Sequence, residues 1–246
     1  MNKTALLSVS DKTDLVTFAQ ELSTLGFDLI ATGKTAKELD TAKIAASAID
    51  SVTGFPEILG GRVKTLHPKI MGGILADLDD PFHRADLNKH AIEPIGLVCV
   101  NLYPFEEMLE KNEDDAILRE FIDIGGVSLI RAAAKNHPHV IVLTDTADYA
   151  WVAGRLKAHG DLTLQERRLL AYKAFEHTAQ YDALVANYFR TSSSDISFPK
   201  TMTLRLKKAQ DLRYGENPHQ RAALYQLPKR HGGVAFAKCH QGKELS

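Results

Sequence analysis

The sequence has little that would tie it to a membrane, a nucleic acid or an oxidising compartment. Its 246 residues include only two cysteines, and its 30 basic residues nearly balance its 31 acidic ones. Cys99 and Cys239 lack metal-ligand spacing, which favours reduced thiols over a disulfide or a zinc site. No apolar run is long enough for a membrane span or a secretory signal. We therefore expect a cytoplasmic globular protein without metal, nucleic-acid or membrane partners.

Two strand–turn–helix units open the chain. Apolar residues 5–9 and 27–31 predict buried strands. Between them, apolar side chains recur at helical spacing over residues 15–25, with Ser10 as a candidate N-cap and Gly26 at the helix end. Repeated units of this kind predict an α/β fold, a parallel sheet flanked by helices. Ligands of such folds bind at the carboxyl ends of the strands.

The turns that follow these two strands each combine hydroxyl groups with a lysine. The residues are Ser10, Asp11 and Lys12 in the first turn, and Thr32, Gly33, Lys34 and Thr35 in the second. Together they predict a phosphate site, to which helix N-termini would add N–H groups. The alternative is that the hydroxyl groups only cap helices. A nucleotide-hydrolase phosphate loop is excluded, because Asp28 stands where its first glycine belongs.

The stretch from Asp123 to His137 offers several kinds of chemistry in few residues. We expect Gly125 and Gly126 to turn the backbone sharply and to approach a ligand closely. A helix predicted over residues 127–135 would present free N–H groups at its start and Lys135 on one face. The alternative is the ordinary start of a buried helix with a solvated lysine.

Two further stretches carry candidate ligand contacts. After a glycine pair, Arg62, Lys64 and Thr65 are predicted in an extended loop held against the body, and Pro68 keeps His67 extended. A third strand is predicted over 95–102, and Tyr103 follows it, where a phenol can donate to a ligand. The alternative for Tyr103 is a buried aromatic.

The remainder of the chain is less informative. Residues 77–94 predict a surface helix and loop, 116–122 a helix, 140–143 a fourth strand, 149–156 a short helix and 164–190 a long amphipathic helix. A linker is predicted over 191–200, then a strand over 204–206 and a loop over 213–219. The tail has too few apolar residues for a core of its own.

Several motifs, in this order along the chain, resemble the bifunctional purine-biosynthesis family that joins an AICAR transformylase to an IMP cyclohydrolase. They are Val9-Ser-Asp-Lys-Thr, Ala31-Thr-Gly-Lys-Thr-Ala, Gly60-Gly-Arg-Val-Lys-Thr-Leu-His-Pro, Asn101-Leu-Tyr-Pro-Phe, Asp123-Ile-Gly-Gly, Arg131-Ala-Ala-Ala-Lys-Asn-His and Leu212-Arg-Tyr-Gly-Glu-Asn-Pro-His-Gln. The resemblance implies a methylglyoxal-synthase-like cyclohydrolase domain over 1–190, the linker at 191–200 and the start of a transformylase domain over 201–246. That second domain is expected to be truncated and inactive.

The resemblance also implies roles for residues. Those implied in catalysis are Lys135, Asp123, Lys64 and Tyr103, with Asp123 holding Lys135 or sharing its proton relay. Those implied to bind the nucleotide are Ser10, Asp11, Lys12, Thr32, Gly33, Lys34, Thr35, Arg62, Val63, Thr65, Val100, Asn101, Ile124 and Gly125. An incomplete AICAR site would involve Arg213, Tyr214 and His219.

The activity implied is ring closure of formyl-AICAR ribotide (FAICAR) to IMP by a homodimer, without metal or cofactor. In the full-length family, 10-formyltetrahydrofolate is the co-substrate of the other reaction. Two alternatives share the fold. A regulatory nucleotide-binding module, like that of carbamoyl phosphate synthetase, would not need the four catalytic candidates together. A methylglyoxal synthase would need a catalytic carboxylate and a small triose site.

Overall fold

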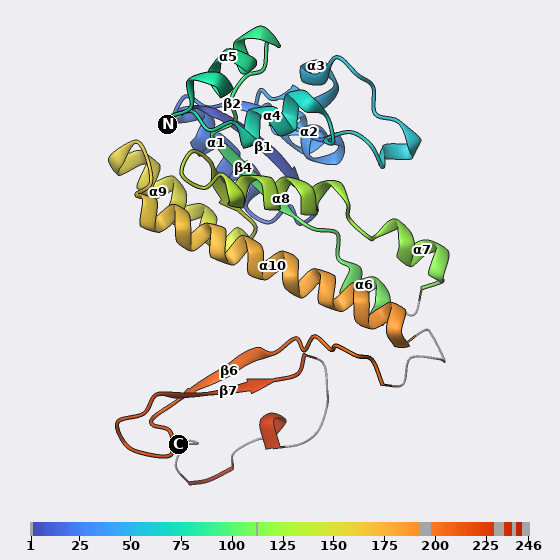
Figure 1. The fold of residues 1–246 in the computed structure, drawn as a ribbon, viewed down its shortest axis with the longest axis vertical. Helices are drawn as coiled ribbons and strands as arrows, with labels where there is room; N and C mark the ends of the chain where they lie inside the picture. Colours follow the sequence, from blue (N-terminus) through green and yellow to red (C-terminus); the bar gives the residue numbers. More distant parts are fainter. Residues whose placement is uncertain (1, 112, 192–197, 229–233, 238–239, 243–246) are drawn as a thin grey trace. The chain divides into compact units, whose positions relative to one another are not determined.

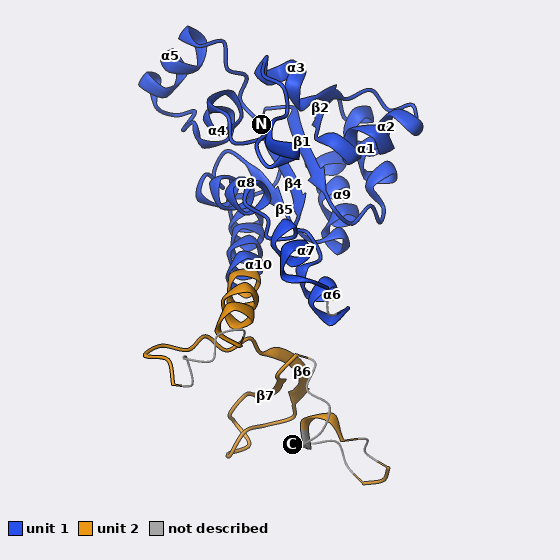
Figure 2. Ribbon diagram, turned by 90° about the vertical axis from the view of Figure 1, so that its right-hand side faces the viewer, with its two compact units in different colours: residues 1–179 blue, residues 180–246 orange. Residues whose placement is uncertain are grey.

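The computed structural model describes residues 2–111, 113–191, 198–228, 234–237 and 240–242 (Figure 1). It divides into two compact units, residues 1–179 and 180–246 (Figure 2), and the division falls inside helix α10, Leu164–Thr191. Most of the predicted linker (192–197), together with Cys239 and residues 243–246, lies outside the described residues. No described helix combines the length and apolar character needed to span a bilayer.

Unit 1 is built on a five-stranded parallel sheet in the order β3-β2-β1-β4-β5, which confirms the predicted α/β fold. The strands are β1 Thr4–Val9, β2 Asp28–Ala31, β3 Ser47–Ala48, β4 Leu97–Asn101 and β5 Ile141–Leu143. The central strands are apolar runs because helices bury both faces of the sheet. The short β3 was missed because Ser47 and Ala48 are exposed and form no such run.

Helices cover both faces of this sheet. Figure 2 shows α4 and α8 on one side of the strands and α1 and α9 on the other, and the members of each pair contact each other. The helices before α10 are α1 Leu15–Thr24, α2 Gly33–Thr41, α3 Ile49–Thr53, α4 Pro68–Leu75, α5 Pro81–Lys89, α6 Phe105–Glu110, α7 Asp115–Glu120, α8 Gly125–Lys135 and α9 Tyr149–His159, with short 3₁₀ turns at Leu59–Gly61 and Thr146–Asp148. Phe18 of α1 stacks on Tyr149 of α9 with ring centroids 4.5 Å apart.

Several local predictions were wrong. Ser10 does not cap α1, since that helix begins at Leu15 and its N-cap is Asp14. Helix α4 was missed because two glycines interrupt its pattern. One of them, Gly73, packs so closely that an added Cβ would lie 2.5 Å from the carbonyl oxygen of Glu93. Buried contacts therefore outweigh low helix propensity at this position.

Unit 2 contains an antiparallel pair, β6 Lys207–Leu212 with β7 Ala222–Gln226, and a 3₁₀ turn at Val234–Phe236. The strand predicted over 204–206 was wrong, because the ladder begins at Lys207. Strand β6 is largely polar and is defined by pairing with β7 rather than by an apolar run of its own. The predicted loop over 213–219 does connect the two strands.

Candidate functional site

The carboxyl ends of three adjacent strands bring the predicted binding turns together. Strand β1 lies between β2 and β4, and Val9, its last residue, is in register with Asn101, the last residue of β4. On the other side, Leu7 is in register with Ala31 at the end of β2. The turn after β1, the turn after β2 and Asn101 therefore meet at one edge of the sheet.

The side chain of Asn101 shapes the turn after β1. Its Oδ1 accepts hydrogen bonds from the N–H groups of Ser10 at 2.5 Å and Asp11 at 2.8 Å, and its Nδ2 donates to the Asp11 carbonyl at 3.2 Å. The Asp11 carboxylate in turn accepts from the Thr13 N–H and hydroxyl, which lower the pKa of Asp11. The turn is thus formed by bonds within the protein.

The two threonines of the second turn bond to β1 rather than to their own helix. The Thr32 hydroxyl lies 2.8 Å from the Ser8 hydroxyl, and the Val9 N–H donates to Thr35 Oγ1 at 3.1 Å. Neither the Thr32 side chain, at the N-cap of α2, nor that of Ser10 caps a helix, so the capping interpretation was wrong for both. In the described part of the chain, the N–H groups of Gly33 and Lys34 have no hydrogen-bond partner, as expected at a helix start.

Lys12 supplies a cation between these two turns. Its ammonium group contacts the Val9 carbonyl and lies 3.4 Å from Thr35 Oγ1. Burial is the main reason that the pKa of Lys12 is lowered from its ordinary value. An anion bound here would compensate the desolvated ammonium group and meet the N–H groups at the start of α2.

Asp123 occupies the N-terminal end of α8, on the neighbouring part of the same edge. Its Oδ1 accepts from the Gly126 N–H at 2.7 Å. The prediction of free N–H groups was therefore wrong for Gly126, whose amide is already bonded within the protein. Burial raises the pKa of Asp123, while the N–H groups of Gly126 and Tyr103 and the charge of Lys64 act in the opposite direction. The carboxylate is therefore partly desolvated beside a cation.

The sharp turn predicted at Gly125 and Gly126 was wrong, because both residues belong to α8. Glycine is required at both positions because other side chains pack closely against the backbone there. An added Cβ on Gly125 would lie 2.8 Å from Thr65 Oγ1, and one on Gly126 would lie 2.5 Å from Asp123 Oδ2. The start of α8 thus forms the wall against which Thr65 and Asp123 pack.

The loop that carries Arg62, Val63, Lys64 and Thr65 lies against this wall. Ile58 and Val63 form an isolated antiparallel bridge around Gly60 and Gly61, which both have positive φ. Thr65 is buried, Val63 and Lys64 are half-buried, and the exposed Arg62 pairs with Glu120 at the end of α7. This confirms a loop held against the body, but the extended backbone was wrong at Arg62, which has helical φ and ψ angles after the 3₁₀ turn Leu59–Gly61. The partner of Arg62 was not foreseen.

The other predicted contacts differ in exposure. Tyr103 packs edge-on against Phe121, with centroids 6.2 Å apart, and is 38% exposed, so the buried-aromatic alternative was wrong. The Val100 side chain is fully buried in β4, which leaves only its backbone for a ligand. Ile124 is 60% exposed beside Gly125.

Lys135 lies at the opposite end of α8 from Asp123. An 11-residue helix is about 16 Å long, and Lys135 is its exposed last residue, near the start of β5. Asp123 therefore cannot hold Lys135 within one chain, and that part of the prediction was wrong. Arg131 on the same helix lies over the Phe175 ring, 5.5 Å from its centroid.

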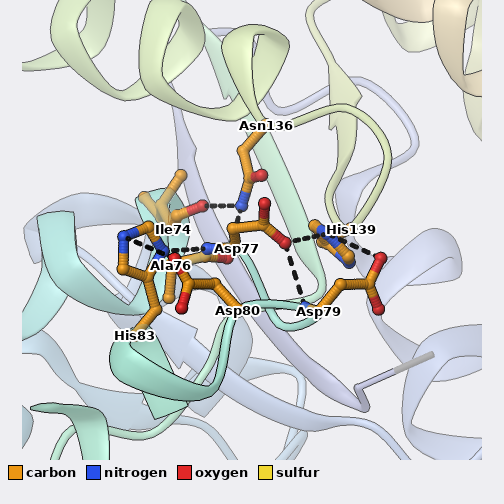
Figure 3. A network of polar contacts seen from close by, with 8 residues as sticks. All are labelled: Ile74, Ala76, Asp77, Asp79, Asp80, His83, Asn136 and His139. Atoms are coloured by element: carbon orange, nitrogen blue, oxygen red, sulfur yellow. Dashed lines mark hydrogen bonds and ion pairs between the residues drawn. The ribbon is translucent and has the colours of Figure 1, made fainter. Parts of the chain in front are cut away.

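A polar cluster that sequence reasoning missed lies at this same end of α8 (Figure 3). His139 Nε2 is 3.0 Å from Asp77 Oδ1 and 3.8 Å from Asp79 Oδ2, and Asn136 donates to the carbonyls of Ile74 and Ala76. The cluster could offer a metal ion three ligand atoms within 4.8 Å of one another. Its observed bonds tie the loop after α4 to the end of α8, at the opposite end of that helix from Asp123.

In unit 2, the predicted AICAR-contacting residues lie on the loop after β6. The Arg213 guanidinium lies 5.8 Å from the centroid of the Tyr214 ring, and Tyr214 and His219 are exposed. The loop is closed by hydrogen bonds between Gly215, Asn217 and Gln220. The roles of Arg213, Tyr214 and His219 stay predictions.

This fold, with two polar turns and a partly desolvated carboxylate at the carboxyl edge of the sheet, places unit 1 among the MGS-like domains. The MGS-like domain family matches residues 14–130, and the family described as AICARFT/IMPCHase bienzyme matches residues 133–246. The crystal structure of ForH superimposes with a TM-score of 0.68 at 38% identity, covering 77% of this chain and 100% of that one.

Similar full-length proteins then specify the family. The chain is 51% identical to the bifunctional purine biosynthesis protein PurH of Lysinibacillus sphaericus, 50% to that of Bacillus subtilis and 49% to that of Aquifex aeolicus. The alignments cover 98–100% of this chain but 48% of each relative, so the chain spans about half the length of the curated relatives it matches. The chain belongs to the PurH family.

Proposed function

We propose that this chain catalyses the IMP cyclohydrolase reaction, the ring closure of FAICAR to IMP. The observation that carries the proposal is the meeting of Lys12 and the start of α2 with Lys64, Tyr103 and Asp123 at one edge of the sheet. The first group suits a ribotide phosphate, and the second suits proton transfer next to a developing oxyanion.

The phosphate would be held by charge and backbone more than by hydroxyl groups. The Gly33 and Lys34 N–H groups point out of the start of α2, and Lys12 lies beside Thr35. Ser10, Asp11 and Asn101 would keep the first turn in shape, and Thr32 and Thr35 would join the turns to β1. Arg62, Val63, Thr65, Val100, Ile124 and Gly125 would line the base and ribose.

In the reaction, the carboxamide nitrogen bonds to the formyl carbon and the formyl oxygen leaves as water, which takes one hydrogen from each nitrogen. The step is intramolecular, so the protein mainly orients the reacting groups and moves protons. Lys64 and Tyr103 would polarise the formyl oxygen, and Asp123, whose pKa is raised by burial, would exchange a proton. Ring closure would need neither metal nor cofactor. The formyl transfer in the longer relatives would use 10-formyltetrahydrofolate.

Lys135 can join this site only from a second copy of the chain. The length of α8 separates it from Asp123 by about 16 Å within one chain, while its exposed position leaves it accessible to a partner. We therefore include a homodimer in the proposal, with Lys135 of one copy facing Asp123 of the other. The proposed domain limits, 1–190 for ring closure, 191–200 for the linker and 201–246 beyond it, place Arg213, Tyr214 and His219 outside this site.

The deciding experiment compares two substrates by absorbance. IMP should form from FAICAR, while dihydroxyacetone phosphate should give no methylglyoxal. Methylglyoxal formation would favour the lyase alternative. IMP binding without turnover of either substrate would favour a regulatory nucleotide-binding module.

A further inference from the structure

We propose that Glu120 is a positioning residue for the site: it holds Arg62, and with it the loop of residues 58–65, against the α7–α8 segment. The inference rests on the proposed function and adds a residue that the motifs do not include. One contact between two segments that are distant in sequence supports it.

The contact joins two atoms of each side chain. Arg62 Nε donates to Glu120 Oε2 at 3.3 Å, and Arg62 Nη2 contacts Glu120 Oε1. Two-point pairing of guanidinium with carboxylate fixes the plane of the guanidinium as well as its place. Each partner stabilises the charged form of the other, which raises the pKa of Arg62 and lowers that of Glu120.

Elsewhere the tip of the loop has weak support. Gly60 and Gly61 have positive φ, and Leu59 is 70% exposed. The bridge between Ile58 and Val63 joins the loop only to itself. On the body side, Thr65 is buried against Gly125, so the C-terminal end of the loop is anchored there, and Arg62 fastens the tip.

The same contact governs Lys64, which lies between these two anchors in the sequence. Lys64 is close enough to Asp123 to oppose the rise in its pKa. If the tip swings outward, Lys64 should follow it and leave the carboxylate. Glu120 therefore acts on the proposed chemistry through Arg62 and Lys64 without touching the substrate.

The ion pair should orient the Arg62 side chain and add little to the stability of the fold. The Arg62 and Glu120 side chains are 62% and 54% exposed, and exposed ion pairs contribute little to the free energy of folding. The contact uses Nε and Nη2, while Nη1 has no hydrogen-bond partner among the described residues, so its donors are not used by the protein there. A ligand can therefore bind Arg62 while Glu120 keeps it in place.

The test compares Glu120→Gln with Glu21→Gln, an exposed glutamate of α1 on the other side of the sheet. For each we would measure the melting temperature, the Kd for IMP by calorimetry, kcat and KM with FAICAR, and hydrogen exchange over residues 58–65. Glu120→Gln should keep the melting temperature, speed exchange in the loop and lower kcat/KM about tenfold. Glu120→Asp should recover part of the loss.

Exchanging the two charges tests whether the ion pair itself holds the loop, apart from the cation that Arg62 offers to a ligand. In the double variant Arg62→Glu with Glu120→Arg, hydrogen exchange in the loop should return towards the wild-type rate. The affinity for IMP should stay weak, because the cation is no longer at position 62. Loop exchange that stays fast in the double variant would overturn the inference. So would a Glu120→Gln variant equal to Glu21→Gln in kcat/KM and loop exchange, provided that the wild-type chain converts FAICAR. A wild-type chain that does not convert FAICAR would overturn the proposed function itself.

Discussion

Asn101, at the end of β4, and Ser10, just after β1, are joined by a hydrogen bond that shapes the turn after β1: Asn101 Oδ1 accepts from the Ser10 N–H at 2.5 Å. The pairing of Val9 with Asn101 in the sheet brings them together. A residue that resemblance to the family assigns to nucleotide binding thus has its side-chain oxygen occupied by the protein.

Two substitutions of Asn101 should distinguish its effect on the shape of the turn from the effect of a charge at this position. Asn101→Ala leaves two N–H groups without their acceptor, and we expect it to lower the free energy of unfolding by about 1–3 kcal/mol. Asn101→Asp keeps the acceptor and should retain most of the stability, but its negative charge should weaken IMP binding more than inosine binding. Urea unfolding and calorimetry on both ligands would test this. Equal losses for IMP and inosine in Asn101→Asp would contradict it.

Lys12→Ala and Thr35→Val should weaken IMP binding far more than they slow the saturated enzyme. Lys12 provides a partly desolvated cation, and Thr35 holds the second turn to β1. Calorimetry with IMP and with inosine gives the readout, and kcat is measured at saturating FAICAR. If inosine loses as much affinity as IMP, these residues do not serve the phosphate.

Lys135→Ala should lower ring closure about 10²–10⁴-fold while IMP binding largely survives, since one proton-transfer group is lost. The length of α8 adds a sharper expectation. Mixing unfolded Lys135→Ala and Asp123→Asn chains and refolding them together should restore about a quarter of wild-type activity, because half the dimers are mixed and each has one intact site. Refolded mixtures as inactive as the separate variants would exclude a site shared between copies.

Two helical glycines should respond oppositely to alanine. Gly126→Ala places a Cβ 2.5 Å from Asp123 Oδ2 and 2.9 Å from Leu102 Cδ2, so it should destabilise the protein and lower ring closure. Gly154→Ala, inside α9 with nothing within 4 Å of the new Cβ, should stabilise by about 0.5–1 kcal/mol. Thermal unfolding of both variants is the measurement. A Gly126→Ala protein as stable as the wild type would show that Asp123 can move.

Asp123 should leave a signature in the pH dependence of stability. Burial raises its pKa in the folded protein, so folding favours the protonated form. Its contribution is present below the ordinary aspartate pKa and is lost as pH rises through the folded value. The stability of the wild type relative to Asp123→Asn should therefore fall from about pH 3 to about pH 7. Urea unfolding across this range tests the sign, and a rising difference would contradict it.

Regular patterns in the sequence predicted the sheet well. The apolar runs that became β1, β2, β4 and β5 are buried on both faces, so their composition alone marks them. Order along the chain then placed Lys12 and Thr35 at one edge. Elements whose existence depends on distant partners were missed: β3 needs β2, and α4 needs the backbone at Glu93 to make its glycines favourable.

Side-chain partners were beyond the reach of the sequence for a related reason. Nothing local indicates that Arg62 meets Glu120, or that Asp77 and Asp79 meet His139, since only the tertiary fold brings them together. The separation of Asp123 and Lys135 could have been inferred, because a helix over 127–135 already implies opposite ends. The stretch from Asp123 to His137 suggested that Asp123 and Lys135 lie together, whereas the helix between them places them apart.

The position of β1 in the sheet has a consequence for how the protein is made. This strand is synthesised before the other strands of the sheet, yet β4, its neighbour on one side, begins only at Leu97. Until then a nascent chain can build only the β1–β2–β3 half of the sheet, with the N–H and C=O groups of β1 open along one edge. When β4 docks, Asn101 arrives with it and closes the turn at Ser10, so the open edge of β1 is covered in the same event that shapes the proposed phosphate site.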